Sequence, residues 1–302
     1  MRTVRTVGDL RAALREPRRA GHTIGLVPTM GALHDGHISL IRAARTANDL
    51  VVVSLFVNPA QFDDAGDLAR YPRDEARDAA LAAAAGTDLL FAPPAGEVYP
   101  DGFATTVHVA GLTETLEGAH RGVAHFDGVA TVVTKLLTMV GPDVAYFGQK
   151  DAQQLAVIRR LVRDLDLPLH IEACPTVREP DGLALSSRNV HLAGADRERA
   201  LALKRGLDAA TAAFEAGERD AAAIAHAGRA AMERLGVEPE YLAVVSPDDL
   251  RPVRTIAADV LVAVAARVGP TRLIDNTVLR LGAWAQTRPP GAGEAAPAAL
   301  AG

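Results

Sequence analysis

The 302-residue chain is long enough to bury a large core, and its length predicts one large domain or two domains of ordinary size. Hydrophobic residues make up 49% and charged residues 23%, as in ordinary soluble globular proteins, although only 4% of residues are aromatic. The formal net charge of −5 argues against a large nucleic-acid interface, because phosphate contacts need concentrated lysine and arginine.

The single cysteine, Cys174, excludes an intrachain disulfide, and its apolar neighbours favour a small buried side chain over a reactive thiol. No apolar run approaches the ~18 residues that a membrane span needs. The N-terminus is polar and basic without a following apolar stretch, so the sequence shows no secretory signal. We therefore expect a cytoplasmic protein that binds neither membranes nor nucleic acid.

Apolar runs alternate with helical patterns through the first half of the chain. The predicted strands cover Thr23–Pro28, Leu50–Val57, Asp88–Ala92, Asp143–Phe147 and Leu169–Ala173. The predicted helices cover His37–Asn48, Asp74–Ala85 (with Gly86 as its C′ residue), Gly128–Val140 and Asp151–Asp164. Continuous apolar strands separated by helices indicate a parallel sheet that is covered on both faces. We predict an α/β fold with a Rossmann-like, doubly wound parallel sheet.

Beyond about Cys174 the pattern changes. An irregular polar segment, Pro175–Val190, precedes two predicted Ala-rich helices at Gly194–Ala216 and Asp220–Leu235. Shorter strands are predicted at Tyr241–Val245, Val260–Ala266 and Arg272–Asp275. We predict a Rossmann-like domain at residues 1–175, a smaller C-terminal α+β domain at 176–286, and a disordered Pro/Gly/Ala-rich tail at 287–302.

A polar segment follows the first predicted strand, where ligands of such sheets bind. Residues 29–37, TMGALHDGH, place two glycines and two histidines between the sheet edge and a helix N-terminus. Gly31 lets the backbone approach a ligand closely, and Gly36 permits a tight entry into the helix. The positive end of that helix favours phosphate. His34 and His37 can donate hydrogen bonds to charge that grows on an α-phosphate, so we predict a nucleotide site here.

Other interpretations of this segment stay open on the residues alone. His34 and His37 also fit surface loop positions, or a metal-binding pair. A metal site lacks further ligands, since neither Cys nor Glu lies nearby. The loop contains no Gly-Lys-Ser/Thr sequence, so kinase-type transfer of a γ-phosphate is not indicated.

Longer motifs narrow the choice. His34-Asp35-Gly36-His37 fits the HxGH signature of the nucleotidyltransferase superfamily that includes class I aminoacyl-tRNA synthetases. Further motifs occur in order: PTMGALHDGH (28–37), FVNPAQF (56–62), YPR (71–73), HFDGVATVVTKL (125–136), FGQKDAQQL (147–155) and TVREPDGLALSSRN (176–189). Together they resemble the pantothenate synthetase (pantoate–β-alanine ligase) family over residues 1 to 282, nearly the whole chain.

The resemblance implies an ATP-dependent condensation of (R)-pantoate with β-alanine to pantothenate, AMP and pyrophosphate through a pantoyl-adenylate intermediate. It implies Mg²⁺ with ATP as co-substrate, small-molecule partners, a homodimer, and a C-terminal domain that acts as a lid. His37, His34 and Lys150 would be catalytic. ATP would contact Met30, Gly31, Ala32, Leu33, His34, Asp35, Gly36, His37, Gly148, Gln149, Lys150, Asp151, Val177, Leu185, Ser186, Ser187 and Arg188.

Two glutamines are assigned to the other substrates. The resemblance places Gln61 at pantoate and β-alanine, and Gln154 at pantoate. A neutral amide suits a hydroxy acid, because it bonds a hydroxyl and a carboxylate without adding a buried charge. On the residues alone, Gln61 is equally well a turn residue after Asn58-Pro59.

Two cationic positions face similar alternatives. Lys150 is a point charge for phosphate at a predicted strand-to-helix turn, with Asp151 as the N-cap, yet a solvated lysine explains the position equally well. Ser186, Ser187 and Arg188 can hold the β- and γ-phosphates, and a linker position lets such a loop close over ATP. This loop resembles the KMSKS loop of the wider superfamily, while its composition alone also fits a plain polar linker.

Departures from the family pattern limit the assignments. Many relatives have Glu at Gln149 and Met at Leu185. Arg121 and His125 are separated by three residues where relatives commonly have two, so Arg121 is left out of the predicted site. The metal ligands stay unassigned, with Asp78 as a candidate that an exposed amphipathic helix explains equally well. The rival functions are another HxGH nucleotidyltransferase, and a non-catalytic nucleotide- or tRNA-binding module.

Overall fold

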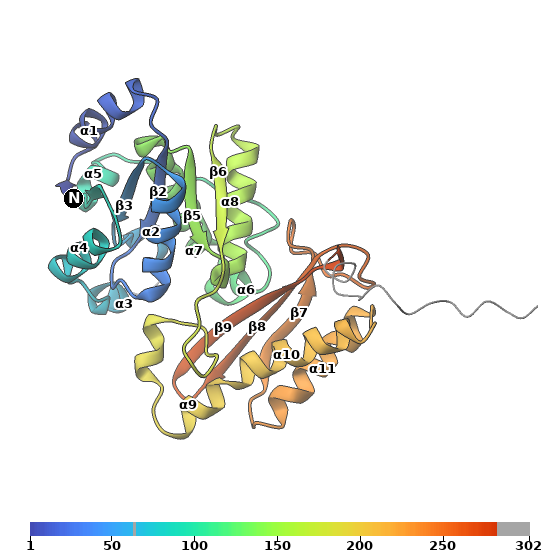
Figure 1. Ribbon diagram of the computed structural model, residues 1–302. Coiled ribbons are helices and arrows are strands. Elements are labelled where there is room, and N and C mark those ends of the chain that lie inside the picture. Colours follow the sequence, from blue (N-terminus) through green and yellow to red (C-terminus); the bar gives the residue numbers. More distant parts are fainter. Residues whose placement is uncertain (63–64, 283–302) are drawn as a thin grey trace, which may run out of the picture.

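The computed structural model describes residues 1–62 and 65–282, which form two sheets with their covering helices (Figure 1). The larger sheet has six strands in the order β1-β4-β3-β2-β5-β6, and every neighbouring pair is parallel. Its strands are β1 (Arg2–Val4), β2 (Ile24–Thr29), β3 (Leu50–Leu55), β4 (Leu89–Phe91), β5 (Val144–Gly148) and β6 (His170–Cys174). The predicted α/β class with a doubly wound parallel sheet is confirmed.

Helices cover both faces of this sheet. The helices and 3-10 turns of this part are α1 (Val7–Arg19), α2 (Asp35–Ala47), η1 (Pro59–Gln61), α3 (Ala65–Arg70), α4 (Glu75–Ala84), α5 (Ala95–Val98), α6 (Glu117–Arg121), α7 (Val123–Val140), η2 (Gln149–Asp151) and α8 (Ala152–Asp164). The predicted helices correspond to α2, α4, α7 and α8, whereas no element was predicted for β1 and α1.

Alternation of side chains explains why the central strands are apolar throughout. Val27, Val51 and Val53 pack with α2 and α4 on one face. Leu26 and Val52 point to the opposite face and pack with α1, α7 and α8. Fully burying such side chains contributes about 1.5–3 kcal/mol each, so the hydrophobic effect holds the three layers together.

Strand order determines where a ligand can bind. From β2 the chain passes to β3 on one side, and β5 later pairs with β2 on the other side. Connections from the ends of β2 and β5 therefore diverge and leave a crevice beyond Thr29 and Gly148. The two predicted nucleotide segments, 29–37 and 148–151, start at these ends.

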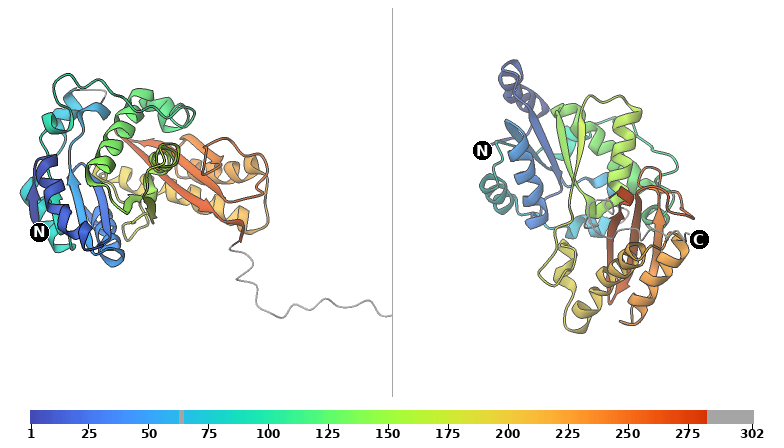
Figure 2. Two further views of the ribbon diagram at one scale, coloured as in Figure 1. Left: turned by 90° about the horizontal axis from the view of Figure 1, so that it is seen from above. Right: turned by 45° about the vertical axis from the view of Figure 1, so that its right-hand side comes forward.

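The second sheet belongs to the C-terminal part and lies beside the first (Figure 2). The sheet is antiparallel, in the order β7-β8-β9, with strands β7 (Pro239–Val245), β8 (Val260–Val268) and β9 (Thr271–Leu279). The helices and the 3-10 turn of the C-terminal part are η3 (Ser187–His191), α9 (Ala195–Ala200), α10 (Ala202–Glu215) and α11 (Ala221–Glu233). One face packs on α10 and α11 in a core of its own. Leu261 and Ala263 on the other face join the core of the larger sheet.

The predicted boundary at residue 175 stays a proposal, supported by the end of β6 at Cys174 and by the separate core that begins at Leu183. The predicted helix Gly194–Ala216 is interrupted at Leu201, which ends α9 and precedes α10. The last predicted strand extends to Leu279, because β9 pairs with β8 along its whole length. Residues 287–302 lie outside the described residues.

Helix α7 is the one helix among the described residues that passes as a membrane span by length and composition alone, with a mean hydropathy of 1.3 over its 18 residues. In this structure 61% of the helix is buried inside the protein, and Val129, Leu136 and Val140 belong to the core of the larger sheet. The core position accounts for its apolar character.

Cys174 follows its prediction. The residue is buried at the end of β6, and burial raises the pKa of its thiol to about 11. A thiol with that pKa is protonated at neutral pH and is a poor nucleophile.

A close approach between α7 and η1 yields a test of packing. A Cβ on Gly128 would lie 2.2 Å from the Ala60 carbonyl oxygen. We expect Gly128→Ala to lower the free energy of unfolding by about 1–3 kcal/mol in urea denaturation, the usual cost of overpacking. Gly96→Ala in α5 is the control, because a Cβ there meets nothing within 4 Å. Equal stability of Gly128→Ala and wild type would contradict the contact.

Candidate active site

A cleft of about 1430 Å³ lies beyond the ends of β2 and β5 and is bounded on its far side by β9 and the connector that follows β6. Most of the predicted site residues line it: Met30, His34, Gly36, His37, Gln61, Gly148, Lys150, Asp151, Gln154, Val177, Leu185, Ser186, Ser187 and Arg188. The predicted ATP contacts that do not line it are Gly31, Ala32, Leu33, Asp35 and Gln149. The cleft is larger than the about 300–1,000 Å³ of common ligand pockets, so two substrates fit.

The turn after β2 is held from behind by Asp78 of α4. Its two carboxylate oxygens accept the N–H groups of Ala32 and Leu33, each at 2.8 Å. Gly31 and Ala32 both have positive φ, 88° and 52°, and a Cβ on Gly31 would lie 3.0 Å from the Asp78 carboxylate. Gly31 is therefore needed for backbone shape and for packing against Asp78, and its predicted close approach to a ligand stays a prediction.

Asp78 was also a candidate ligand for Mg²⁺, and the structure gives it a different role. Its side chain is 2% exposed and both oxygens are occupied by the turn. Within residues 1–62 and 65–282, no group of three or more His, Cys, Asp or Glu side chains is arranged to hold a metal ion. The metal-pair interpretation of His34 and His37 therefore lacks ligands.

The two histidines face each other at the start of α2, with ring centroids 4.2 Å apart. His34 is the N-cap, and its Nδ1 accepts the Gly36 N–H at 3.1 Å. The Nδ1 of His37 accepts the His34 N–H at 3.4 Å. Because each Nδ1 accepts a hydrogen bond, we assign the proton of each neutral ring to Nε2, where it can be donated to a ligand.

Both imidazoles are neutral at ordinary pH. Burial, and next the neighbouring His34, lower the pKa of His37 to about 3. Burial is also the main cause that lowers the pKa of His34, followed by the charge of Lys150. The Gly36 position is tight, since a Cβ would lie 2.9 Å from the His34 ring. The predicted role of Gly36 was a tight turn, and the structure shows that its lack of a side chain leaves room for His34.

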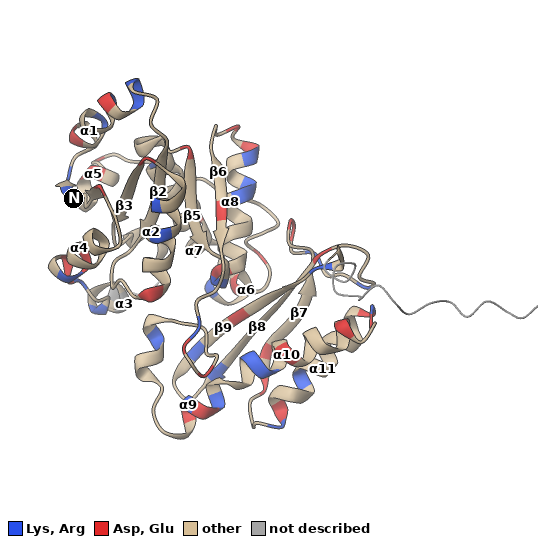
Figure 3. Ribbon diagram, viewed as in Figure 1, with Lys and Arg blue, Asp and Glu red and all other residues tan. Residues whose placement is uncertain are grey.

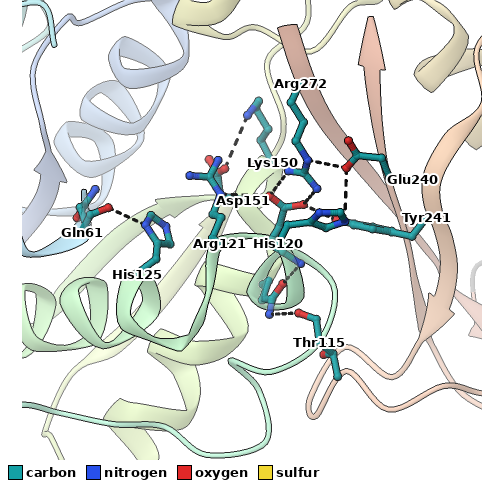
Figure 4. Close-up of polar contacts among 12 residues, drawn as sticks. Gln61, Thr115, His120, Arg121, His125, Lys150, Asp151, Glu240, Tyr241 and Arg272 are labelled. Atoms are coloured by element: carbon teal, nitrogen blue, oxygen red, sulfur yellow. Dashed lines mark hydrogen bonds and ion pairs between the residues drawn. The ribbon is translucent and has the colours of Figure 1, made fainter. Parts of the chain in front are cut away.

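Gln61 is held in place by residues that the sequence analysis did not assign. Asn58 is buried, and its Nδ2 donates to Gln61 Oε1 at 3.1 Å and to Gly128 O at 3.0 Å. A ring nitrogen of His125 lies 2.8 Å from the Gln61 carbonyl oxygen (Figure 4). The FVNPAQF and HFDG motifs contained both residues, but only the fold shows that they meet.

Lys150 lies on η2, where β5 leads into α8. Its side chain is 18% exposed, and Nζ is 3.7 Å from Asp151 Oδ1. Asp151 occupies the N-cap position of α8, as predicted, but its side chain makes no capping hydrogen bond. Gln149 presents its carbonyl oxygen to Asn276 of β9, so its backbone is the part that is held there.

The connector after β6 brings its predicted residues to the cleft. The Leu185 N–H donates to Val177 O at 2.9 Å, so these two residues lie opposite each other in the connector. Ser186 is the N-cap of η3, and its Oγ accepts the Arg188 N–H at 3.2 Å. Leu185 also reaches α2, with Cδ2 3.9 Å from a Cβ built on Gly36. The connector therefore lies against the HxGH turn.

An ionic network that the sequence did not reveal joins α6 to the second sheet at the cleft. The Arg272 guanidinium donates to both oxygens of Glu117, at 2.7 and 2.8 Å, and the Tyr241 hydroxyl donates to Oε1 at 2.8 Å. Burial alone would raise the pKa of Glu117, but these hydrogen bonds and the charge of Arg272 hold it at about 2. Figure 4 shows Arg272, Tyr241 and Arg121 converging from different elements.

Arg121, which was left out of the predicted site because of its spacing, lines this cleft. Its Nε donates to Glu117 Oε2 at 3.3 Å. Desolvation within the cleft, and next the charge of Arg121, lower the pKa of Arg188, although Arg188 keeps much of its surface exposed. With Lys150, these guanidiniums make the cleft suitable for a polyphosphate. Elsewhere acidic and basic residues are interspersed over both parts of the chain (Figure 3).

The fold and the cleft together define a class of protein. An HxGH turn with two neutral imidazole donors lies at the switch point of a parallel sheet, opposite a lysine and a Ser-Ser-Arg loop. These are the features of the HxGH nucleotidyltransferases.

Comparisons with known proteins identify the family within that class. The family model described as pantoate-beta-alanine ligase matches residues 2–278. A pantothenate synthetase of Koribacter versatilis is 52% identical over 281 residues, which are 93% of this chain and 96% of that protein. The chain belongs to the pantoate–β-alanine ligase family.

Solved structures agree. The crystal structure of pantothenate synthetase from Thermus thermophilus has a TM-score of 0.85 at 50% identity and covers 92% of this chain and 99% of its own. That of pantoate-beta-alanine ligase from Francisella tularensis, complexed with beta-gamma ATP and beta-alanine, has a TM-score of 0.72 at 34% identity and covers 92% and 97%.

The anchor behind the nucleotide turn can be tested at Asp78. An amide has one acceptor oxygen where the carboxylate has two, so Asp78→Asn leaves the N–H of Ala32 or Leu33 facing another donor. We expect the free energy of unfolding in urea to fall by about 1–3 kcal/mol, together with a loss of ATP-dependent activity. Glu75→Gln on the same helix breaks an exposed pair with Arg5 and should cost less than about 1 kcal/mol. Similar results for the two variants would argue against the anchor.

The Glu117 network predicts a pH dependence of stability. Its carboxyl has a pKa of about 2 in the folded chain against 4.5 as the ordinary value. The charged form therefore stabilises the fold fully above the ordinary value, and this contribution is lost as the pH falls toward 2. We expect the stability difference between wild type and Glu117→Gln, from urea denaturation, to be largest above pH 5 and to shrink at lower pH. A difference that stays constant from pH 7 to pH 3 would contradict the assignment.

Proposed function

We propose that the chain condenses pantoate with β-alanine to pantothenate, with ATP converted to AMP and pyrophosphate. The observation that carries this proposal is the cleft that unites the HxGH turn, Lys150, the Ser186–Arg188 loop and the two glutamines Gln61 and Gln154. The Francisella relative, whose structure is complexed with beta-gamma ATP and beta-alanine, supports the same pair of ligands for this site.

In the first step a carboxylate oxygen of pantoate attacks the α-phosphorus of ATP. The bond from that phosphorus to the bridging oxygen breaks, and pyrophosphate leaves with the electron pair. The Nε2–H groups of His37 and His34 stabilise the charge that grows on the α-phosphate oxygens. Lys150, Arg188 and the hydroxyls of Ser186 and Ser187 hold the leaving pyrophosphate.

In the second step the amine of β-alanine attacks the acyl carbon of pantoyl adenylate. The carbon–oxygen bond to AMP breaks, the amide forms, and the amine loses a proton to the departing phosphate or to water. Gln61 holds pantoate and lies beside the incoming amine, while Gln154 holds pantoate from α8. Positioning and electrostatics account for the rate in both steps, because a substrate is itself the nucleophile in each: pantoate in the first and β-alanine in the second.

Mg²⁺ enters this scheme with ATP as part of the co-substrate. Magnesium commonly keeps several waters and binds through substrate phosphates and one or two carboxylates. Asp151 lines the cleft next to Lys150 with half of its side chain exposed, so it is the carboxylate best placed to contact such a complex. The cytoplasmic location and the homodimer implied by the family resemblance stay predictions.

The rival functions fit the cleft less well. A nucleotidyltransferase that acts on a phosphate ester needs cationic side chains around its second substrate. The residues that we assign to the second substrate are the amides of Gln61 and Gln154, which line the cleft, and Asn58 holds Gln61 from behind. Neutral amides match a hydroxy acid better than a phosphate ester.

A single-turnover experiment tests the proposed reaction. Pyrophosphate release from ATP is expected to require pantoate and not β-alanine, because adenylation precedes amide formation. AMP release should require both. His37→Ala is expected to slow pyrophosphate release by about 100-fold or more, the scale of losing a preorganised donor, with an unchanged circular dichroism spectrum. Pyrophosphate release without pantoate would overturn the mechanism.

A further inference from the structure

Strand β9 contacts both η2 and the connector after β6 through a pair of buried polar residues. Asp275 and Asn276 are adjacent on this strand and are 4% and 5% exposed. A carboxylate and an amide are costly to bury unless they make hydrogen bonds, so the partners of these two residues show what they hold in place.

Asn276 reaches across to η2. Its Nδ2 donates to the carbonyl oxygens of Gln149 at 3.0 Å and Lys150 at 2.8 Å. Both amide protons are therefore used on two consecutive carbonyls of the segment that carries the Lys150 ammonium into the cleft. Asn276 itself lines the cleft, and its Oδ1 has no hydrogen-bond partner among the described residues.

Asp275 holds the connector from the same place. Its two oxygens pair with the Arg178 guanidinium at 2.6 and 3.0 Å, and Oδ1 also accepts the Asn276 N–H at 2.8 Å. Arg178 follows Val177 in the connector, close to the pairing with Leu185. The dipeptide therefore fixes the relative positions of η2, the connector and β9.

We infer that Asn276 is a positioning residue for the ligase reaction. By holding the two carbonyls of η2, it determines where the Lys150 side chain lies in the cleft. The inference rests on the proposed role of Lys150 at the triphosphate. Lys150 follows β5 of the larger sheet, and Asn276 is on β9 of the C-terminal sheet. The lysine is therefore placed correctly only when the C-terminal part packs against the larger sheet. Asn276 does not touch the reacting atoms and acts through Lys150.

A matched control exists in Asn48. It is also buried, its Nδ2 also donates to two acceptors, Ala44 O at 2.8 Å and the Tyr146 hydroxyl at 2.6 Å, and its Oδ1 is also unpartnered among the described residues. Asn48 lies at the C-terminal end of α2, whose 13 residues separate it from His34 by about 20 Å. The two substitutions to alanine therefore remove similar interactions at different distances from the cleft.

The test measures pantoate-dependent pyrophosphate release at saturating ATP for wild type, Asn276→Ala, Asn48→Ala, Lys150→Ala and the double variant of positions 276 and 150. We expect Asn276→Ala to lower the rate about 10- to 100-fold, the effect of a misplaced catalytic group. Asn48→Ala should stay within about twofold of wild type while losing comparable stability. In the Lys150→Ala background, Asn276→Ala should change the rate by less than about twofold, because the two residues act as a unit.

Other results would decide differently. Equal rates for Asn276→Ala and Asn48→Ala would overturn the inference, as would the same rate loss with and without Lys150. If Asn276→Ala fails to fold, Asn276→Ser, which keeps one donor, must show the same dependence on the background. Wild-type protein without pantoate-dependent release would refute the proposed function itself, a result distinct from failure of the Asn276 variants.

Discussion

The divergence of the chain at β2 and β5 is the constraint on which this structure depends. Neighbouring parallel strands whose connections leave in opposite directions cannot be covered by backbone at their carboxyl ends. The gap receives the HxGH turn from one strand and the lysine turn from the other. All other parts of the site are placed with respect to this opening, including the second sheet, which forms its opposite wall.

Three buried carboxylates around the cleft have specific partners. Asp78 accepts hydrogen bonds from backbone N–H groups and pairs with Arg77, Glu117 pairs with Arg272, and Asp275 pairs with Arg178. Such groups contribute little to net stability relative to apolar residues, but breaking one pair leaves a costly unpaired charge. They restrict how the turn, the connector and the second sheet can be arranged, which is what a site assembled from separated segments requires.

The sequence was sufficient for the larger sheet apart from its edge strand β1, for most helices and for the segments that surround the cleft. Strands such as Leu50–Val57 and helix Gly128–Val140 were predictable because both depend on local periodicity, and the nucleotide segments were predictable from motifs that occur in a fixed order along the chain. Long-range pairings could not be predicted. Glu117 and Arg272 lie 155 positions apart, and Asn276 contacts a carbonyl 126 positions away, so no local pattern marks them. The contact between Gly31 and Asp78 is hidden for the same reason, since it joins the turn after β2 to α4.

The backbone hydrogen bonds to Nδ1 of His34 and His37 have a consequence for turnover. A cationic group in this position would attract the α-phosphate in substrate, transition state and product alike, and would retain AMP. Neutral dipoles whose orientation is already set respond mainly to the increase in charge at the α-phosphate during displacement. On the proposed role of these histidines, the imidazole pair therefore stabilises the transition state more than it binds either nucleotide.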